Sequence, residues 1–410
     1  MSRQHVWVRP LDAGTSARAR QSFATRRVPA SAMRTLVGGA VRPRSGDVVL
    51  ARVERLGHHR RIEQPNGRRS ALHLDDTVVV AYADRYATDQ FESHVPRSLG
   101  RVQLVASGGI ASQALSQSRS VRRATDIVPL GLVGDEFGRP LNVWDFRMPD
   151  VVPPAERPRT VAVIGTSMNA GKTTTMHYLL HGLSKIGVNP GSVKVTGTGS
   201  GNDYWVMLDA GAHRMLDFTD AGLASTFRQP IPVLESVMTQ LVAQLTTAGC
   251  GVNFVEIADG VFQDDNRMLL TSPVVHDLLD VVVLAASDAM GAAYGVAHLR
   301  ELGFEVAAVS GMLTRSPLAI RETQEATGLP VWGIPELQAP ELVIPVLGID
   351  PTLARQPEPP PPAAWPIELE GLDPELIELA DAELVDAELA DAELVGPGRH
   401  ESGSLLHRAG

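Results

Sequence analysis

Two different rhythms of apolar and polar positions divide the chain. Between residues 46 and 146 the apolar runs are short, rich in β-branched residues and separated by tight turns, which is typical of strands. The predicted strands are Val48–Val53, Arg60–Glu63, Thr77–Ala83 and Val102–Ala106. The Asn-Gly pair in the turn Gln64-Pro65-Asn66-Gly67, directly after the second of these strands, favours a hairpin. We therefore expect a small β-barrel or sandwich-like domain over residues 46–146, with a short helix at Ile110–Ser118.

From residue 160 to residue 350 short β-branched runs alternate with longer amphipathic stretches. This alternation predicts a mainly parallel sheet covered by helices, so the expected fold class is α/β. The predicted strands are Thr160–Ile164, Ser192–Thr196, Val252–Ile257, Val281–Ala286, Val306–Ser310 and Val331–Ile334. The predicted helices are Thr173–Lys185, Val233–Ala248, Ala292–Leu302 and Leu318–Thr327.

The remaining segments have weak or biased patterns. Residues 1–45 are rich in Arg, Ala and Ser and predict a loosely structured lead-in, and the four prolines of residues 147–159 predict a linker. Residues 351–410 are Pro-rich and then acidic, with a five-residue D-A-E-L-[VA] repeat. Because five residues do not match the helical period of 3.6, the leucines of this repeat cannot form one apolar stripe. We expect a low-complexity acidic tail.

The composition indicates where the protein is located and shows that its charges are unevenly distributed along the chain. No apolar run reaches the roughly 18 residues that cross a bilayer, no secretory leader is evident and Cys250 is the single cysteine, so we expect a cytoplasmic protein without membrane contact. Residues 1–150 hold 23 arginines against 14 acidic residues, whereas residues 351–410 hold 3 against 13. The basic front domain or the acidic tail could therefore bind a protein partner. We do not expect nucleic acid, because the aromatic residues of single-strand binders are sparse.

A glycine-rich loop carries the clearest chemistry. It follows a predicted strand, precedes a predicted helix and consists of Gly165, Thr166, Ser167, Met168, Asn169, Ala170, Gly171, Lys172, Thr173 and Thr174. Consecutive backbone N–H groups at a helix start form a cradle for phosphate, and glycine permits the close approach. In such a Walker A loop Lys172 would reach the β- and γ-phosphates, and Thr173 would ligate Mg²⁺. The sequence thus predicts a nucleoside triphosphate, ATP with GTP not excluded, together with Mg²⁺.

Three further residues have side chains that suit phosphate chemistry. Only three of the 37 basic residues are lysines, and one of them, Lys194, follows a predicted strand beside a Gly-rich turn. Glu256 ends an apolar strand, where an acid is costly unless it serves a metal. Asp203 lies in the segment after Lys194 and is a third candidate.

The loop GTSMNAGKT resembles the GTDxxVGKT loop of dethiobiotin synthetase and its relatives in the cobyrinic acid a,c-diamide synthase group. VKVTGTGSG places Lys194 22 residues beyond Lys172, as in that family, which implies that Lys194 holds substrate and the transferring phosphate. VEIADG resembles the family's V-E-G-A-G-G, which implies a magnesium role for Glu256, and Asp203 resembles its metal-assisting aspartate. The family also implies a homodimer. KVTGTGSGNDYWVMLDAGAHRML resembles, in addition, the P-loop accessory protein of molybdopterin guanine dinucleotide synthesis.

Three functions follow from these patterns. The first is an ATP-dependent, Mg²⁺-requiring ligase-like enzyme that transfers the γ-phosphate to a small carboxylate- or carbamate-like substrate. Its catalytic residues would be Lys172 and Lys194, and its metal ligands Thr173, Asp203 and Glu256. The second is a regulatory or accessory NTPase that acts on a protein partner. The third is a polynucleotide kinase, whose binding of nucleic acid would weaken with salt.

Overall fold

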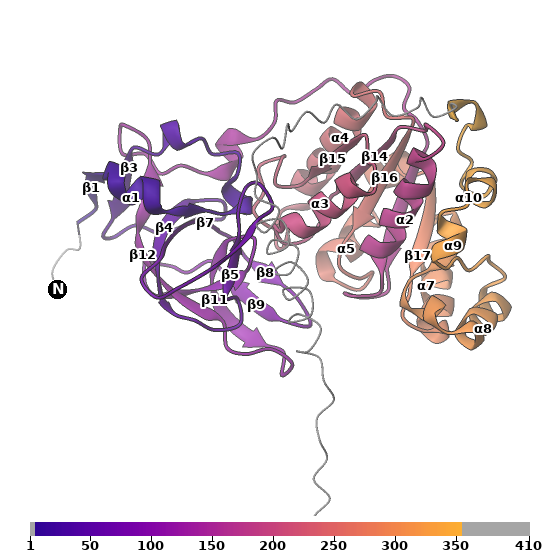
Figure 1. Ribbon diagram of the computed structural model, residues 1–410, viewed down its shortest axis with the longest axis horizontal. Helices are drawn as coiled ribbons and strands as arrows, with labels where there is room; N and C mark the ends of the chain where they lie inside the picture. Colours follow the sequence, from indigo (N-terminus) through magenta and orange to yellow (C-terminus); the bar gives the residue numbers. More distant parts are fainter. Residues whose placement is uncertain (1–4, 355–410) are drawn as a thin grey trace, which may run out of the picture. The chain divides into compact units, whose positions relative to one another are not determined.

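A computed structural model describes residues 5–354 of the 410-residue chain. In this part a ten-stranded sheet precedes a six-stranded sheet, and a separate two-stranded hairpin accompanies the first (Figure 1). The predicted acidic repeat lies outside the described residues. No helix of the described part is long and apolar enough to cross a membrane.

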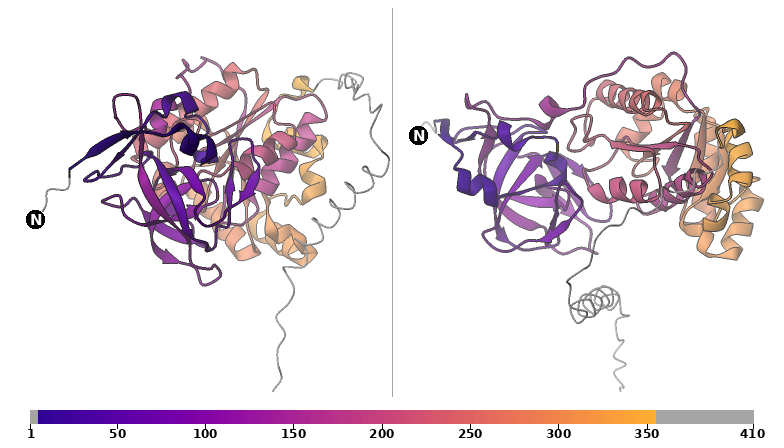
Figure 2. Two further views of the ribbon diagram at one scale, coloured as in Figure 1. Left: turned by 60° about the vertical axis from the view of Figure 1, so that its left-hand side comes forward. Right: turned by 45° about the horizontal axis from the view of Figure 1, so that its top comes forward.

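The core of the first sheet is a closed ring of strands. Its members are β4 (Val48–Arg55), β7 (Thr77–Tyr82), β10 (Val102–Ala106), β11 (Ile110–Gln117) and β12 (Thr125–Gly134). Going round the ring, β4 pairs with β7, β7 with β11, β11 with β10, β10 with β12, and β12 again with β4. These purple strands curl into a barrel in both views of Figure 2. In β4, Val48 and Leu50 pack into one apolar cluster and Val49 and Ala51 into another, because successive strand residues point to opposite faces.

Two expectations for this half are wrong. The expected loose lead-in over residues 1–45 is wrong for its described part, because residues 5–45 supply three strands and a helix: β1 (Trp7–Pro10), α1 (Ala13–Arg18), β2 (Arg20–Gln21) and β3 (Thr35–Gly38). β3 joins β12 and buries Leu36 and Val37, so tertiary pairing overrides the weak local pattern. The expected helix at Ile110–Ser118 is strand β11, which enters the barrel through its buried first residues.

The Asn-Gly hairpin is confirmed. β5 (Arg61–Glu63) pairs with β6 (Arg69–Ala71), and Gly67 adopts a φ of 86°, which favours glycine. A Cβ on Gly67 would lie 2.5 Å from Trp205 Nε1, in the second half of the chain. The hairpin tip therefore packs directly on that half. Two further strands, β8 (Arg85–Tyr86) and β9 (Phe91–His94), pair with each other, and β9 extends the sheet from β11.

The second sheet is parallel, as predicted, in the order β15-β14-β16-β13-β17-β18. Its strands are β13 (Thr160–Gly165), β14 (Pro190–Lys194), β15 (Arg214–Asp217), β16 (Val252–Ile257), β17 (Val281–Ala285) and β18 (Val306–Ser310). Its helices are α2 (Lys172–Ser184), α3 (Gly201–Asp209), α4 (Ile231–Thr247), α5 (Asp264–Leu269), α6 (Pro273–Leu278), α7 (Ala289–Glu301), α8 (Pro317–Thr327), α9 (Ile334–Leu337) and α10 (Pro340–Leu347).

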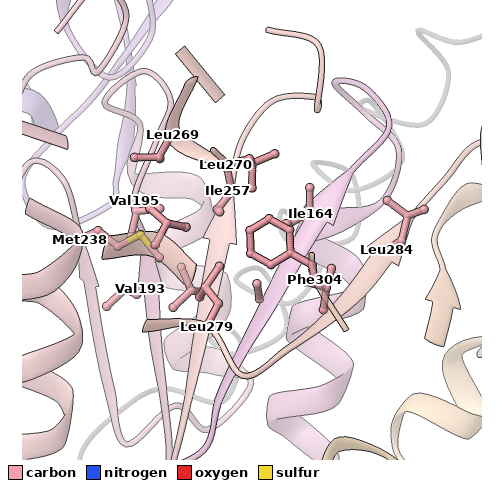
Figure 3. Packing of buried hydrophobic residues seen from close by; sticks show 14 of the residues in the cluster. Ile164, Val193, Val195, Met238, Ile257, Leu269, Leu270, Leu279, Leu284 and Phe304 are labelled. Carbon is pink, nitrogen blue, oxygen red and sulfur yellow. The ribbon is translucent and has the colours of Figure 1, made fainter. Parts of the chain in front are cut away.

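Helices cover both faces of this sheet. Ala162 and Ile164 of β13 lie in a cluster with α4 to α7, while Val161 and Val163 lie in a cluster with α2, α3, α9 and α10. Figure 3 shows Ile164, Val193 and Ile257 of three adjacent strands in the first of these clusters. Strands that are buried on both faces have continuous apolar sequences, and for this reason they could be predicted from the sequence.

One strand expected in this half is wrong. Val331–Ile334 does not form a strand: Val331 makes a single bridge to Val309, and α9 begins at Ile334. Pro335 has no N–H for a sheet ladder but suits the first turn of a helix, so the chain turns helical there. Residues 147–159, the predicted linker, contain no helix or strand.

A buried ionic cluster joins the barrel to the parallel sheet. Arg26 Nη2 lies 2.8 Å from Asp220 Oδ2 and 3.3 Å from Asp217 Oδ1, at the end of β15. The same guanidinium lies over the Phe23 ring, 4.0 Å from its centroid, and 5.2 Å from the centroid of Tyr204 in α3. Residues 5–354 thus belong to one compact unit rather than two separable ones.

We expect Arg26→Met to lower the free energy of unfolding by about 3–5 kcal/mol, because it removes the cation paired with buried Asp217 and the closer of the two arginines paired with buried Asp220. Urea unfolding followed by circular dichroism measures this. The matched control is Arg52→Met, which breaks an exposed pair with Asp75 and should cost about 0–1 kcal/mol. Equal losses in the two variants would contradict the assignment of Arg26 as the buried link.

Candidate phosphate site

The glycine-rich loop connects β13 to the start of α2. Gly171, the N-cap of α2, has a φ of 104°, and a Cβ there would lie 2.8 Å from Gly311 Cα. Only glycine is compatible with both the dihedral and this contact. Ala170 is buried beneath the loop, and its carbonyl accepts from Met312 N at 2.9 Å. The loop is thus held from below by the segment after β18, while the first N–H groups of α2 have no partner within the helix.

Lys172 lies across the loop. Its side chain packs on Gly165, where a Cβ would lie 2.8 Å from Lys172 Cδ, and the residue is only 6% exposed. The ammonium donates to the carbonyl of Ser167 at 2.9 Å and to that of Asp259. Burial lowers the pKa of Lys172, although the Glu256 and Asp259 carboxylates act in the opposite direction. In a nucleotide complex, phosphate oxygens would replace these two carbonyl oxygens as acceptors, with little movement of the ammonium.

Three residues from separate elements meet beside Lys172. Thr173 Oγ1 lies 3.3 Å from Asp203 Oδ1 and 3.5 Å from Glu256 Oε1. Parallel pairing sets Lys194 of β14 opposite Glu256 of β16, and α3 carries Asp203 in its first turn. The structure therefore brings together the five predicted catalytic and metal-binding side chains. Of the other loop residues, Ser167, Asn169 and Thr174 have exposed side chains, and Thr166 and Met168 are half-buried.

Lys194 lies between the two carboxylates. Its ammonium pairs with Asp203 and lies 4.0 Å from Glu256 Oε1. Burial disfavours the charge on Lys194, but these carboxylates outweigh it and raise the pKa of the ammonium. Burial likewise would raise the pKa of Asp203, yet Lys194 lowers it, whereas burial prevails at Glu256 and raises its pKa. The charge of Lys194 thus offsets the repulsion between the carboxylates of Asp203 and Glu256.

The oxygen donors fit a magnesium ion bound together with a nucleotide. Glu256 is 2% exposed, and its Oε2 is buried without a hydrogen-bond partner. No group of three or more His, Cys, Asp or Glu residues suited to a metal occurs in residues 5–354. Mg²⁺ commonly takes one or two carboxylates and completes its shell with water and phosphate oxygens. A hydroxyl and two carboxylates match that partial set.

Sequence reasoning missed the contribution of the barrel to this site. Glu63, at the end of β5, accepts from Gly201 N at 2.7 Å and so caps α3, the helix that carries Asp203. Asp89 accepts from Asn169 Nδ2 at 2.8 Å, at the outer side of the loop. Glu63 ends a strand of only three residues, Arg-Ile-Glu, and Asp89 lies in a turn, so neither acid has the sequence signal of Glu256, which lies near the end of a longer apolar strand.

Comparison with known proteins yields distant structural likenesses only. No family model matches the chain, and no curated protein matches it. The signal recognition particle receptor FtsY from Elizabethkingia anophelis is 16% identical over 43% of this chain, with a TM-score of 0.30, and the chain spans 58% of that protein's length. The signal recognition particle 54 kDa protein from Aeropyrum pernix K1, solved with GDP, is 18% identical over 50% of each chain, with a TM-score of 0.32.

A third solved structure, a DUF1611 family protein from Anabaena variabilis, is 14% identical over 48% of this chain and 63% of its own, with a TM-score of 0.34. These scores are too low to carry function from any of the three proteins. The likeness to dethiobiotin synthetase stays a prediction. What the structure itself shows is a six-stranded parallel sheet covered by helices, with a glycine-rich loop between β13 and the start of α2.

Proposed function

We propose that this chain is an enzyme that binds a nucleoside triphosphate with Mg²⁺ and transfers the γ-phosphate to a small carboxylate- or carbamate-like acceptor. The observation that carries this proposal is the convergence of Lys172, Lys194, Thr173, Asp203 and Glu256. They gather at the carboxyl ends of the adjacent strands β14, β16 and β13, where open α/β sheets bind their ligands.

Phosphoryl transfer needs little covalent chemistry from the protein, which must align the reactants and neutralise charge. The unpaired N–H groups at the start of α2 would bind the β-phosphate, and Lys172 would bridge to the γ-phosphate. Lys194, released from Asp203, would neutralise charge on the transferred group. Mg²⁺, held by Thr173, Asp203 and Glu256, would supply further charge neutralisation. ATP is our proposed nucleotide, with GTP as the competitor in the same assay.

The direct test compares two neighbouring hydroxyls. Thr173→Ala removes the hydroxyl beside Asp203 and Glu256, whereas Thr174→Ala, the control, removes an exposed one. We expect isothermal titration with ATP and GTP to show binding to the unaltered protein that weakens at least tenfold when EDTA removes Mg²⁺. In Thr173→Ala this dependence on Mg²⁺ should largely vanish, and in Thr174→Ala it should persist. A protein that binds neither nucleotide would sink the proposal.

One contact supports the second candidate, a regulatory NTPase. The hydrogen bond between Asn169 and Asp89 couples the loop to the barrel, so that a nucleotide could alter the surface that the barrel presents. This alternative predicts slow phosphate release that small metabolites do not accelerate and a protein partner does. The phosphotransfer proposal predicts the reverse.

A further inference from the structure

Arg85 is a buried cation that its surroundings satisfy only in part. It begins β8 and is 6% exposed. Its Nη2 donates to Gln90 Oε1 at 2.9 Å, but its Nε is buried and has no hydrogen-bond partner. None of the ion pairs within residues 5–354 includes Arg85. A buried guanidinium with idle donors is costly, so its retention in a folded protein calls for a further partner.

The contact of Arg85 with His59 does not supply that partner. Arg85 Nη1 lies 3.5 Å from His59 Nε2, and the same ring nitrogen lies 2.8 Å from the Val105 carbonyl oxygen. A carbonyl oxygen only accepts, so Nε2 must carry the proton and donate to Val105. It then has no lone pair for Arg85. Burial, helped by the Arg85 charge, lowers the pKa of His59 to about 3, so the ring is neutral.

Asp89, in the same part of the barrel, has a carboxylate oxygen that lacks a hydrogen-bond donor. It lies in the turn between β8 and β9; its Oδ2 accepts from Asn169, and its Oδ1 is buried without a partner. The carboxylates of Asp89 and Asp259 both act on the charge of Arg85, opposing the burial that lowers the pKa of Arg85 to about 10. Asp259 is the residue whose carbonyl accepts from Lys172. Free donors and a free acceptor of the barrel thus adjoin the phosphate site.

We propose that Arg85 and Asp89 bind the phosphate acceptor, a small molecule with a planar oxyanion and a neighbouring hydroxyl or amino group. The fork of a guanidinium matches a carboxylate or carbamate through two parallel hydrogen bonds, and Asp89 Oδ1 accepts from the neighbouring O–H or N–H. This inference rests on the proposed function, because it gives the acceptor its place beside the loop. It assigns the barrel the part of a substrate-binding domain.

The test uses the smallest probes that contain this chemistry, measured by ligand-observed NMR with ADP and Mg²⁺ present. Glycolate has the oxyanion and the hydroxyl, acetate lacks the hydroxyl, and glycolamide lacks the charge. We expect glycolate to bind more tightly than acetate, and glycolamide not to bind. Arg85→Met should weaken glycolate at least tenfold, while Arg119→Met, an exposed arginine of the same barrel, should leave it unchanged. Asp89→Ala should abolish the preference for glycolate over acetate.

Further variants and the nucleotide titration distinguish a failure of this inference from a failure of the proposed function. Arg85→Met removes an incompletely paired charge, so its melting temperature should not fall, and Arg85→Lys checks that a cation without the fork restores binding only in part. If the unaltered protein binds nucleotide but none of the probes, or if Arg85→Met binds glycolate as well as the unaltered protein does, this inference is wrong and the proposed function stands. Absence of nucleotide binding would overturn both.

Discussion

Lys172→Ala should reduce nucleotide-dependent phosphate release by about 10²–10³-fold, the range found when one preorganised hydrogen-bond donor is removed from a catalytic site. Lys172 is the cation within the loop itself, and the ammonium lies against Gly165 and the Ser167 carbonyl. Its loss leaves the γ-phosphate without its nearest fixed charge. The measurement is a coupled phosphate-release assay together with calorimetric titration of ATP and GTP.

The control for this change is another of the three lysines of the chain. Lys185, the C-cap of the same helix, is exposed and should tolerate replacement by Ala without loss of binding or turnover. Because burial lowers the pKa of Lys172 and so disfavours its charge, Lys172→Ala should melt at or near the temperature of the unaltered protein. A folded Lys172→Ala protein that hydrolyses nucleotide normally would contradict the assignment of the loop.

Glu256→Gln should lower phosphate release by about 10²–10³-fold as well, with a different signature. The substitution keeps the shape of a side chain that is 2% exposed but removes its charge and leaves Lys194 with Asp203 alone. We expect nucleotide affinity in EDTA to be retained and the gain in affinity from Mg²⁺ to be lost. Titrations with and without Mg²⁺ separate the two effects.

Asp264→Asn is the matched control for Glu256→Gln. It removes the charge of an exposed acid in α5 that pairs with Arg267 on the surface. Its nucleotide affinity and phosphate release should stay unchanged at every Mg²⁺ concentration. If Glu256→Gln keeps the full response to Mg²⁺, the buried carboxylate has a structural role and the metal is held elsewhere.

The parallel sheet could be predicted because each long strand is buried on both faces and so contrasts with the helices around it. Strand β15 (Arg214–Asp217) escaped prediction: it has four residues and begins and ends with charged ones. Asp203 was predicted as a candidate in the segment after Lys194, but the helix α3 that carries it was not predicted. That helix packs on the barrel through Tyr204 and is capped by Glu63, contacts that no local pattern contains.

The candidate site divides in the same way. The loop, Lys194 and Glu256 have local signatures, because a glycine-rich turn or an acid at the end of an apolar strand stands out in the sequence. Arg85 has no such signature, since it is one of 23 arginines in the first 150 residues. Its distinctive properties, burial and donors without partners, arise only from the packing around it in the folded chain.

The close fit of the hairpin and of Arg26 against α3 and β15 has a practical consequence for truncation. Expressing residues 160–354 alone would expose Trp205 and Tyr204 to solvent. It would also leave Asp217 and Asp220 without the arginine that pairs with both of them. Such a fragment should aggregate or melt early. Inactivity of the isolated fragment would therefore say nothing about where the chemistry resides.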